Sequence, residues 1–205
     1  MARKLGETSY KQTAFGIIPR SKLIPLEIEG IKRAWDFVLE RTAGGKILIT
    51  PATLQQVHEI GFGWIFPEMG GKFRMIDVTV SSHKPPSYYE IPELMKNFCD
   101  DVETRIKHLP KIKEQNYLEG LIELLAWTHH RFLWIHPFQD YNGRIGRLLI
   151  NIILLDLALP AIELKVETIA HRKRYIKALQ TADQGNLILL EGMIEQALQE
   201  AGEAI

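Results

Sequence analysis

The chain has 205 residues, and its 25 lysines and arginines equal its 25 aspartates and glutamates in number, so its formal net charge is zero. This balance excludes a broad basic surface of the kind that holds nucleic acid or an anionic membrane, and we expect neither partner. A single cysteine, Cys99, excludes a disulfide scaffold and is typical of a reducing compartment, so we predict a cytoplasmic protein.

Taken in chain order, the sequence is mainly helical in its periodicity. The apolar spacing predicts helices over residues 26–41, 51–65, 91–109, 114–135, 142–158, 168–181 and 185–201. Between the second and third of these, residues 70–86 combine a Gly-Gly turn, a run rich in Ile, Val and Thr, and a Pro-Pro stop, which predicts a β-hairpin. The predicted fold class is therefore mainly α, a helical bundle with one β-hairpin.

The most apolar run, residues 148–159, is interrupted by Asn151 and Asp156 and ends at Pro160. It is too short and too polar to cross a bilayer, so we interpret it as a buried central helix. The N-terminus shows no signal-peptide pattern. These features predict one compact domain with a helical N-terminal extension.

Residues 136–147, which read His-Pro-Phe-Gln-Asp-Tyr-Asn-Gly-Arg-Ile-Gly-Arg, bring together the side chains that phosphate chemistry needs. An imidazole such as His136 can accept a proton from a hydroxyl near neutral pH. Pro137 disfavours the helical region for the residue before it, so His136 should end a helix. Asp140 offers a hard oxygen ligand that suits Mg²⁺ beside substrate phosphates.

The second half of this segment predicts an anion site. Asn142 and Gly143 form a turn dipeptide from which the helix 142–158 should begin, and the first N–H groups of a helix favour an anion. Gly143 has no side chain, so a phosphate could approach the backbone closely. Arg144 and Arg147 are three residues apart and share one helix face, where both can donate to phosphate oxygens.

Each of these residues taken alone has a simpler interpretation. His136 could be a loop or capping residue, Asp140 a turn residue, and the arginines surface residues. Their joint occurrence argues against that. His129 and His130 also suggest a metal site, but adjacent helical residues point about 100° apart and no third ligand follows at zinc spacing, so we set zinc aside.

The segment resembles the signature of the Fic (filamentation induced by cAMP) family, whose pattern is His, any, Phe, any, Asp or Glu, Gly, Asn, Gly, Arg, two variable residues, Arg. The resemblance implies a Fic-fold helical bundle that moves AMP from ATP to a hydroxyl of a target protein. By the same resemblance, His136 deprotonates the hydroxyl and Asp140 holds Mg²⁺. Asn142, Gly143 and Arg144 form the anion hole, and Arg147 binds the departing phosphates.

Tyr141 departs from the pattern, because the family usually has glycine at this first residue of the anion nest. Tyrosine still supplies a backbone N–H for the phosphates, but its ring could crowd the nucleotide. Gly143 matters as well: the sister Doc branch, which transfers the terminal phosphate of ATP, has lysine there. Gly143 therefore favours transfer of a nucleotidyl group.

Two further roles follow from the resemblance. The predicted hairpin at residues 70–86 corresponds to the family's flap, whose edge at Met75, Ile76, Asp77 and Val78 would pair with the target; an ordinary surface hairpin is the alternative. Residues 1–45 would form an extension with an inhibitory helix, and residues 46–205 the catalytic domain.

In that helix, Glu29 followed by Gly30 matches the end of the family's inhibitory motif, which implies a Glu29–Arg147 pair that displaces a phosphate. The preceding Ser/Thr position is Pro25, so the match is partial. The alternative is that Glu27 and Glu29 only favour the start of a helix.

The sequence thus predicts a protein adenylyltransferase that uses ATP and Mg²⁺ on a Ser, Thr or Tyr hydroxyl of another protein. Two alternatives stay open. One is a Fic-fold transferase with another nucleotide or phosphate-linked donor, and the other is a catalytically silent binding module. A homodimer is also compatible with the sequence, which does not encode the target.

Overall fold

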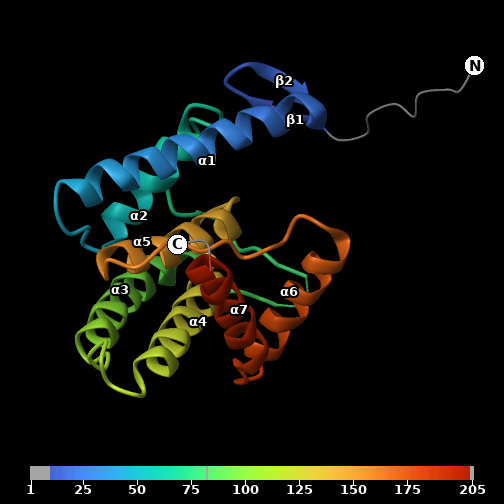
Figure 1. Ribbon diagram of the computed structural model, residues 1–205. Coiled ribbons are helices and arrows are strands. Elements are labelled where there is room, and N and C mark those ends of the chain that lie inside the picture. The colour runs from blue at the N-terminus through green and yellow to red at the C-terminus, as the bar shows by residue number, and fades with distance from the viewer. Residues whose placement is uncertain (1–9, 82, 204–205) are drawn as a thin grey trace, which may run out of the picture.

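Helices form most of the structure, and helix α5 runs through its centre (Figure 1). The computed structural model describes residues 10–81 and 83–203. In chain order the elements are β1 (Tyr10–Thr13), β2 (Gly16–Pro19), α1 (Arg20–Ala43), α2 (Pro51–His58), the π-helical turn η1 (Glu59–Gly63), the 3₁₀ turn η2 (Tyr88–Glu90), α3 (Ile91–Lys107), α4 (Tyr117–Ile135), α5 (Asn142–Asp156), α6 (Ile169–Ala182) and α7 (Ile188–Glu203).

The α5 helix is buried on most sides, as its nearly continuous apolar sequence predicts. Its residues Ile145, Leu149, Ile153 and Leu154 are fully buried. It packs on α4, which in turn contacts α3 and α7, while α1 and α2 cover it from the other side (Figure 1). Within residues 10–81 and 83–203, no helix has the length and apolarity needed to cross a membrane.

The predicted helices agree with the structure to within a few residues at most ends, with α1 as the main difference. We expected it to begin after Pro25, but it begins at Arg20 and contains that proline. The reason is local: β2 ends at Pro19, which is extended and serves as the N-cap, so the chain enters the helix directly from the hairpin. The α1 helix then packs along η1.

The β-hairpin is present, but it does not lie at residues 70–86 as predicted. The regular hairpin of the described chain is β1–β2, which pairs residues 10–13 with residues 16–19. Residues 72–81 and 83–86, which we call the flap, make only the isolated bridges Phe73–Phe138 and Val80–His83. The backbone N–H of Arg74 donates to the Pro137 carbonyl. The flap therefore pairs at its base with the signature loop, and this pairing replaces a regular hairpin.

Candidate active site

His136 lies where α4 ends and the signature loop begins. It adopts a left-handed conformation, with φ of 51°, and Pro137 follows it, as the sequence predicts for a residue that ends a helix. Its Nδ1 lies 3.3 Å from the Leu133 carbonyl oxygen, which can only accept a hydrogen bond. Nδ1 therefore holds the proton of the neutral ring, which leaves the lone pair of Nε2 available as a base.

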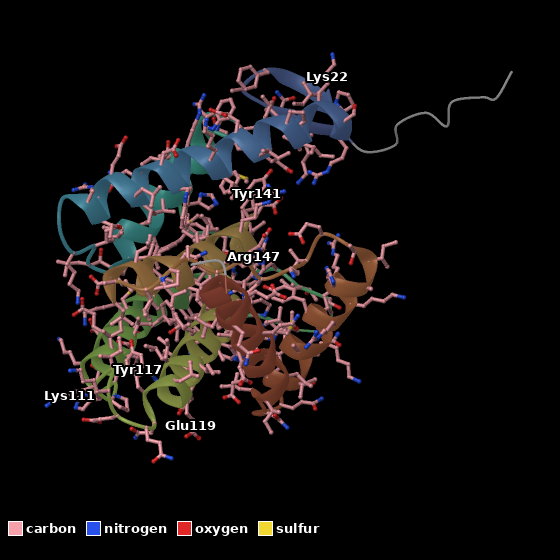
Figure 2. All side chains as sticks on the ribbon, viewed as in Figure 1. Lys22, Lys111, Tyr117, Glu119, Tyr141 and Arg147 are labelled. Carbon is pink, nitrogen blue, oxygen red and sulfur yellow. The ribbon has the colours of Figure 1, made fainter. Side chains whose placement is uncertain are left out.

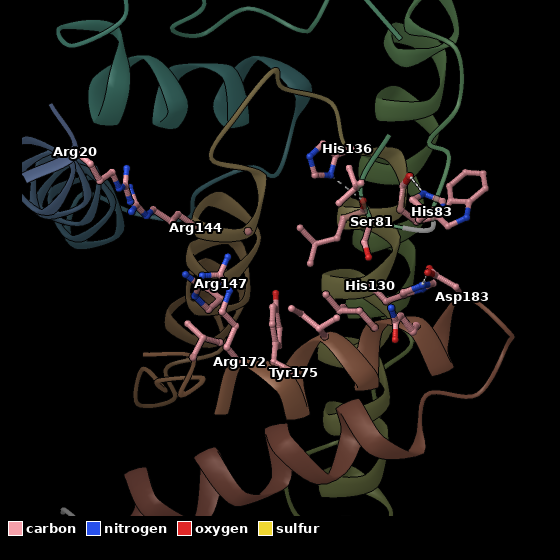
Figure 3. Close-up of a pocket in the computed structure, with 18 residues that line it drawn as sticks. Arg20, Ser81, His83, His130, His136, Arg144, Arg147, Arg172, Tyr175 and Asp183 are labelled. Carbon is pink, nitrogen blue, oxygen red and sulfur yellow. Dashed lines mark hydrogen bonds and ion pairs between the residues drawn. The ribbon is translucent and has the colours of Figure 1, made fainter. Parts of the chain in front are cut away.

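The surroundings of His136 keep its ring neutral. Burial lowers the pKa of His136 from 6.5 to about 4, and the nearby positive charge of Arg74 also lowers it. Desolvation disfavours the charged imidazolium form, so the base is unprotonated at neutral pH. The side chain faces a cavity of about 590 Å³ together with the α5 N-terminus, part of the flap and α6 (Figure 3).

Asn142 fixes the shape of the loop that follows His136. Its side-chain Oδ1 accepts from the Phe138 N–H at 2.9 Å, and its Nδ2 donates to the Phe138 carbonyl at 2.8 Å. Asn142 is 1% exposed, and its side chain stabilises the loop from inside through these two hydrogen bonds. What it can offer to an anion is its backbone N–H, in the first turn of α5.

His58, which sequence reasoning missed, supports the same loop from α2. Its Nδ1 accepts from the Gly71 N–H at 3.0 Å, so its Nε2 holds the proton and donates to the Asp140 carbonyl at 3.2 Å. The ring stacks on Phe138 with centroids 4.0 Å apart. Burial lowers the pKa of His58 to about 4, which keeps this donor and acceptor pattern at neutral pH.

Asp140 has one carboxylate oxygen committed to the loop and one turned toward a cation. Its Oδ1 accepts from the Tyr141 N–H at 2.8 Å, and its Oδ2 lies 3.2 Å from the Lys11 ammonium on β1. Its side chain is 44% exposed. A hard oxygen that already faces a positive charge fits the predicted Mg²⁺ ligand.

The N-terminus of α5 opens on the cavity at Gly143. A methyl group at Gly143 would meet only Arg147 Nη1, at 3.6 Å, so the space in front of this backbone is free. In the described structure no hydrogen bond engages the N–H of Asn142 or Gly143, whereas the N–H of Arg144 is bonded to the Tyr141 carbonyl. Two N–H groups of the predicted anion hole are thus available to an anion.

Four arginines converge on the cavity from three helices (Figure 3). Arg144 and Arg147 come from α5, Arg20 from the start of α1 and Arg172 from α6. Of these, Arg20 and Arg144 form ion pairs with a carboxylate, whereas Arg147 and Arg172 form none within the described residues. Nη1 of Arg144 is buried and has no hydrogen-bond partner within the described chain.

The carboxylate at these arginines belongs to Glu27, and the predicted role of Glu29 is wrong. Glu29 is 46% exposed and pairs with Arg33 one turn along α1. Glu27 is 2% exposed and accepts from Arg144 Nη2 at 2.8 Å, from Arg20 Nη1 at 2.6 Å and from the Tyr141 hydroxyl at 2.8 Å. Residues two apart on a helix point about 200° apart, so only one of the two glutamates can face the site.

Glu27 stays ionised in these surroundings. Burial raises its pKa, but hydrogen bonds from Arg144, Arg20 and Tyr141 outweigh that effect, and the net pKa is lower than usual. Its partner is Arg144, the first signature arginine, and not Arg147 as we expected.

Tyr141 accommodates its unusual position by turning its ring away from the cavity. Its backbone has φ of 66°, the left-handed value that explains glycine in the family pattern. The ring stacks on Phe62 at 3.9 Å and lies beneath α1 (Figure 2). Tyr141 does not line the cavity, and its N–H is bonded to Asp140. The structure therefore does not support the predicted contact of Tyr141 with phosphates, nor the predicted crowding of the nucleotide by its ring.

The predicted docking edge of the flap is accessible. Met75 is 76% exposed and Ile76 52% exposed, and the side chains of Asp77 and Val78 are exposed and partly buried, respectively. The Asp77 carboxylate accepts from the Tyr88 N–H at 2.9 Å, which ties the flap to η2. On the cavity side, the flap contributes Val80, Ser81 and His83 (Figure 3).

Comparison with known protein families agrees with this geometry. The model of the Fic/DOC family matches residues 48–154, slightly more than half of the chain, and these residues contain α2 to α5 and the signature loop. The chain belongs to the Fic/DOC family. The site described above lies almost wholly inside the matched region, while Glu27, Arg20 and Lys11 precede it and Arg172 follows it.

Individual Fic proteins are similar over most of this chain. The protein adenylyltransferase Fic of Culex quinquefasciatus is 30% identical over 161 residues, which cover 78% of this chain and 30% of that protein. The protein of the same name from Nematostella vectensis is 27% identical over 187 residues, 91% of this chain and 40% of that protein. The chain thus spans about a third of the length of these relatives.

Solved Fic structures share the fold. Residues 134–508 of Fic-1 from C. elegans superpose with a TM-score of 0.67 at 24% identity, covering 87% of this chain and 51% of that one. The BepC protein of Bartonella tribocorum, solved with bound AMPPNP, gives a TM-score of 0.65 at 18% identity and covers 94% and 93% of the two chains. The predicted recognition and the Fic fold are confirmed.

Several residues of this Fic site had no motif to reveal them. For Glu27 there was a signal: Leu23, Gly30, Ala34 and Val38 place a buried stripe on α1, and position 27 falls in it. Arg74 stood in the Gly-x-Phe-Arg sequence that opens the flap, but its burial could not be read there. Lys11 and His58 had no sequence signal, because their contacts join segments far apart in the chain.

Proposed function

We propose that this chain is a protein adenylyltransferase that transfers AMP from ATP to a Ser, Thr or Tyr hydroxyl of a target protein, with Mg²⁺. The observation that supports it most is that the free Nε2 of His136, the open α5 N-terminus at Gly143 and Arg147 face one cavity of about 590 Å³. A base, an anion site and a positive side chain are thus set around one space. The relatives that bear the name protein adenylyltransferase support the same activity.

In this reaction the target hydroxyl oxygen forms a bond to the α-phosphorus of ATP. The bond from that phosphorus to the α,β-bridging oxygen breaks, and pyrophosphate leaves with the bonding electrons. His136 Nε2 accepts the hydroxyl proton, for which its neutral state is required. The N–H groups of Asn142 and Gly143 would donate to the α-phosphate, and Arg147 would hold the leaving phosphates.

Asp140 is the residue that would hold Mg²⁺. Its Oδ2 faces a cation in this structure, and its Oδ1 is fixed by the Tyr141 N–H, so the carboxylate is already oriented. When bound, Mg²⁺ would neutralise charge on the phosphates. The protein's part is to present this oxygen beside the anion hole.

We further propose that the described state is a resting state, with Glu27 in the inhibitory role that we first assigned to Glu29. Glu27 occupies Nη2 of Arg144, a side chain that we predicted to donate to phosphate oxygens. A carboxylate and a phosphate compete for the same guanidinium. Displacement of Glu27 would free both Arg144 and Arg20, which share it.

The experiment that tests the function is transfer of label from ATP to proteins of a cell extract and to the chain itself, with Mg²⁺. We expect incorporation of an α-phosphate label and none of a γ-phosphate label. His136→Ala should abolish the incorporation, whereas His108→Ala, a change at an exposed histidine on the far end of α3, should not. Incorporation of γ label would instead indicate phosphorylation. No incorporation of either label with the wild type or with Glu27→Gln would contradict adenylylation.

A further inference from the structure

Arg74 at the base of the flap has the largest of the fully buried side chains in the described structure, and it is a cation without a close carboxylate. The nearest ion pair that it makes is to Asp77 Oδ1 at 3.8 Å, from an aspartate side chain that is 56% exposed. A charge buried in this way requires compensating hydrogen bonds, because removal from water costs several kcal/mol. The groups that accept hydrogen bonds from Arg74 therefore indicate its structural role.

All the close hydrogen-bond acceptors of this guanidinium are backbone carbonyl oxygens, and they belong to two segments. Nε donates to His136 O at 2.8 Å, and Nη2 to Ile135 O at 3.4 Å. Nη1 donates to Ile76 O at 2.8 Å, and Nη2 also to Pro86 O at 2.5 Å. The first pair of carbonyls lies where α4 ends, and the second pair lies in the flap, at Ile76 on its docking edge and at Pro86, its last residue.

The carbonyls of Ile135 and His136 lack helical partners because α4 stops there. The last carbonyl groups of a helix attract a cation. His136 must also hold a left-handed backbone conformation, which costs free energy for a residue other than glycine. The hydrogen bond from Arg74 Nε to the carbonyl of His136 itself opposes a return to the helical conformation.

The backbone of the flap strengthens the same connection. The Arg74 N–H donates to Pro137 O at 2.9 Å, and Phe73 forms an antiparallel bridge with Phe138. Side chain and backbone thus join the flap to residues 135–138 at successive positions. The segment that would hold the target and the residue that would activate its hydroxyl are fixed to each other through Arg74.

We propose that Arg74 is a positioning residue for the transfer reaction: its planar guanidinium fixes the His136 backbone and two points of the flap, Ile76 and Pro86, in one rigid arrangement. This inference rests on the proposed function, because it assigns Arg74 to the placement of the target hydroxyl against His136. Arginine is required, since a lysine has the charge but not the fork of five donors that reaches four carbonyls.

The test compares Arg74→Lys and Arg74→Met with Arg33→Lys, a matched change at a half-exposed arginine of α1. Each protein is assayed at a temperature where circular dichroism shows it folded. We expect kcat for adenylyl transfer to fall about tenfold or more in both Arg74 variants. The affinity for ATP, measured by binding of a non-hydrolysable analogue, should change less than twofold. Arg33→Lys should alter neither quantity. Added guanidinium should partly restore kcat in Arg74→Gly.

A second readout does not depend on activity. NMR titration of isotope-labelled histidine should show the pKa of His136 rising in Arg74→Met, since that variant loses a nearby positive charge, and not in Arg33→Lys. If the variants do not fold, the wild type still tests the proposal: the Arg74 Nε–H signal should shift as His136 titrates.

Unchanged kcat and an unchanged His136 titration in folded variants would overturn the proposal and leave Arg74 a stabiliser of the fold. Absence of transfer in the wild type would count against the proposed function alone, because the titration would still report on Arg74.

Discussion

Oε2 of Glu27 accepts a hydrogen bond of 2.8 Å from Nη2 of Arg144, across a separation of 117 residues in the chain. The same carboxylate accepts from Arg20 and Tyr141 through Oε1. A helix that precedes the family domain thus supplies the negative charge at the cavity. A tyrosine can replace the usual glycine at position 141 because its ring is buried beneath α1 and its hydroxyl donates to Glu27 of that helix.

Glu27→Gln should raise adenylyl transfer, because an amide no longer competes with phosphate for Arg144. We expect a gain in kcat/KM for ATP of about tenfold, equivalent to about 1.4 kcal/mol. Glu29→Gln is the matched control: it removes an exposed carboxylate of the same helix and should leave the rate unchanged. Steady-state transfer assays at fixed target concentration measure both. Equal rates for the wild type and Glu27→Gln would show that Glu27 does not restrain the site.

Lys11→Met should lower the Mg²⁺ concentration needed for half-maximal metal binding. The Lys11 ammonium lies 3.2 Å from Asp140 Oδ2 and would compete with Mg²⁺ for the same oxygen. The pair is about half exposed, so we expect a shift of about twofold to fivefold. Lys22→Met, at an exposed position on α1, is the control (Figure 2). Calorimetry or Mn²⁺ binding in the presence of an ATP analogue would measure the shift, and identical curves for the three proteins would contradict it.

The acid limit of the reaction should lie well below the ordinary pKa of histidine. Burial lowers the pKa of His136 from 6.5 to about 4, so the base remains unprotonated as the pH falls through 6.5. We expect kcat/KM to stay near its plateau there and to decline only as the pH approaches the lower value. A decline centred at 6.5, in protein shown to be folded, would contradict the buried state of His136.

The same shift affects stability. His136 binds its proton more weakly in the folded chain than in the unfolded chain, so between about 4 and 6.5 the unfolded state holds more protons. The stability contributed by the neutral ring is complete above 6.5 and is lost as the pH falls toward 4. His58, whose pKa is also lowered to about 4, adds to the same trend. Urea denaturation across this range should show the unfolding free energy rising with pH.

His58→Phe should destabilise the fold, because it removes two buried hydrogen bonds. The substitution keeps an aromatic ring beside Phe138 but leaves the Gly71 N–H and the Asp140 carbonyl without their buried partner. We expect the unfolding free energy to fall by about 2–4 kcal/mol, from two lost hydrogen bonds in a buried place. His108→Phe, at an exposed position, should change it by less than about 0.5 kcal/mol. Denaturant titration measures both, and similar values for the two variants would contradict the supporting role of His58.

The sequence alone determined the family and most of the helices, and it singled out the residues that we propose as base, metal ligand and anion hole. The family and the helices could be predicted because their signals are local. The Pro after His136 ends α4, the Asn-Gly pair begins α5, and the apolar spacing of a helix repeats within a few residues. A motif confined to twelve residues keeps its geometry wherever the chain places it.

Only the tertiary structure decided which carboxylate meets the arginines and where the hairpin forms. Whether position 27 or 29 faces inward depends on how α1 packs on η1, where a side chain at Gly30 would overlap the Gly61 carbonyl. That close approach fixes the rotation of the helix and hence the direction of Glu27. The flap pairs with residue 138 next to Arg74, which is buried among carbonyls of its own flap and of residues 135 and 136. The Arg74–His136 and Glu27–Arg144 hydrogen bonds join residues 62 and 117 positions apart, and no local pattern encodes the partner of a long-range hydrogen bond.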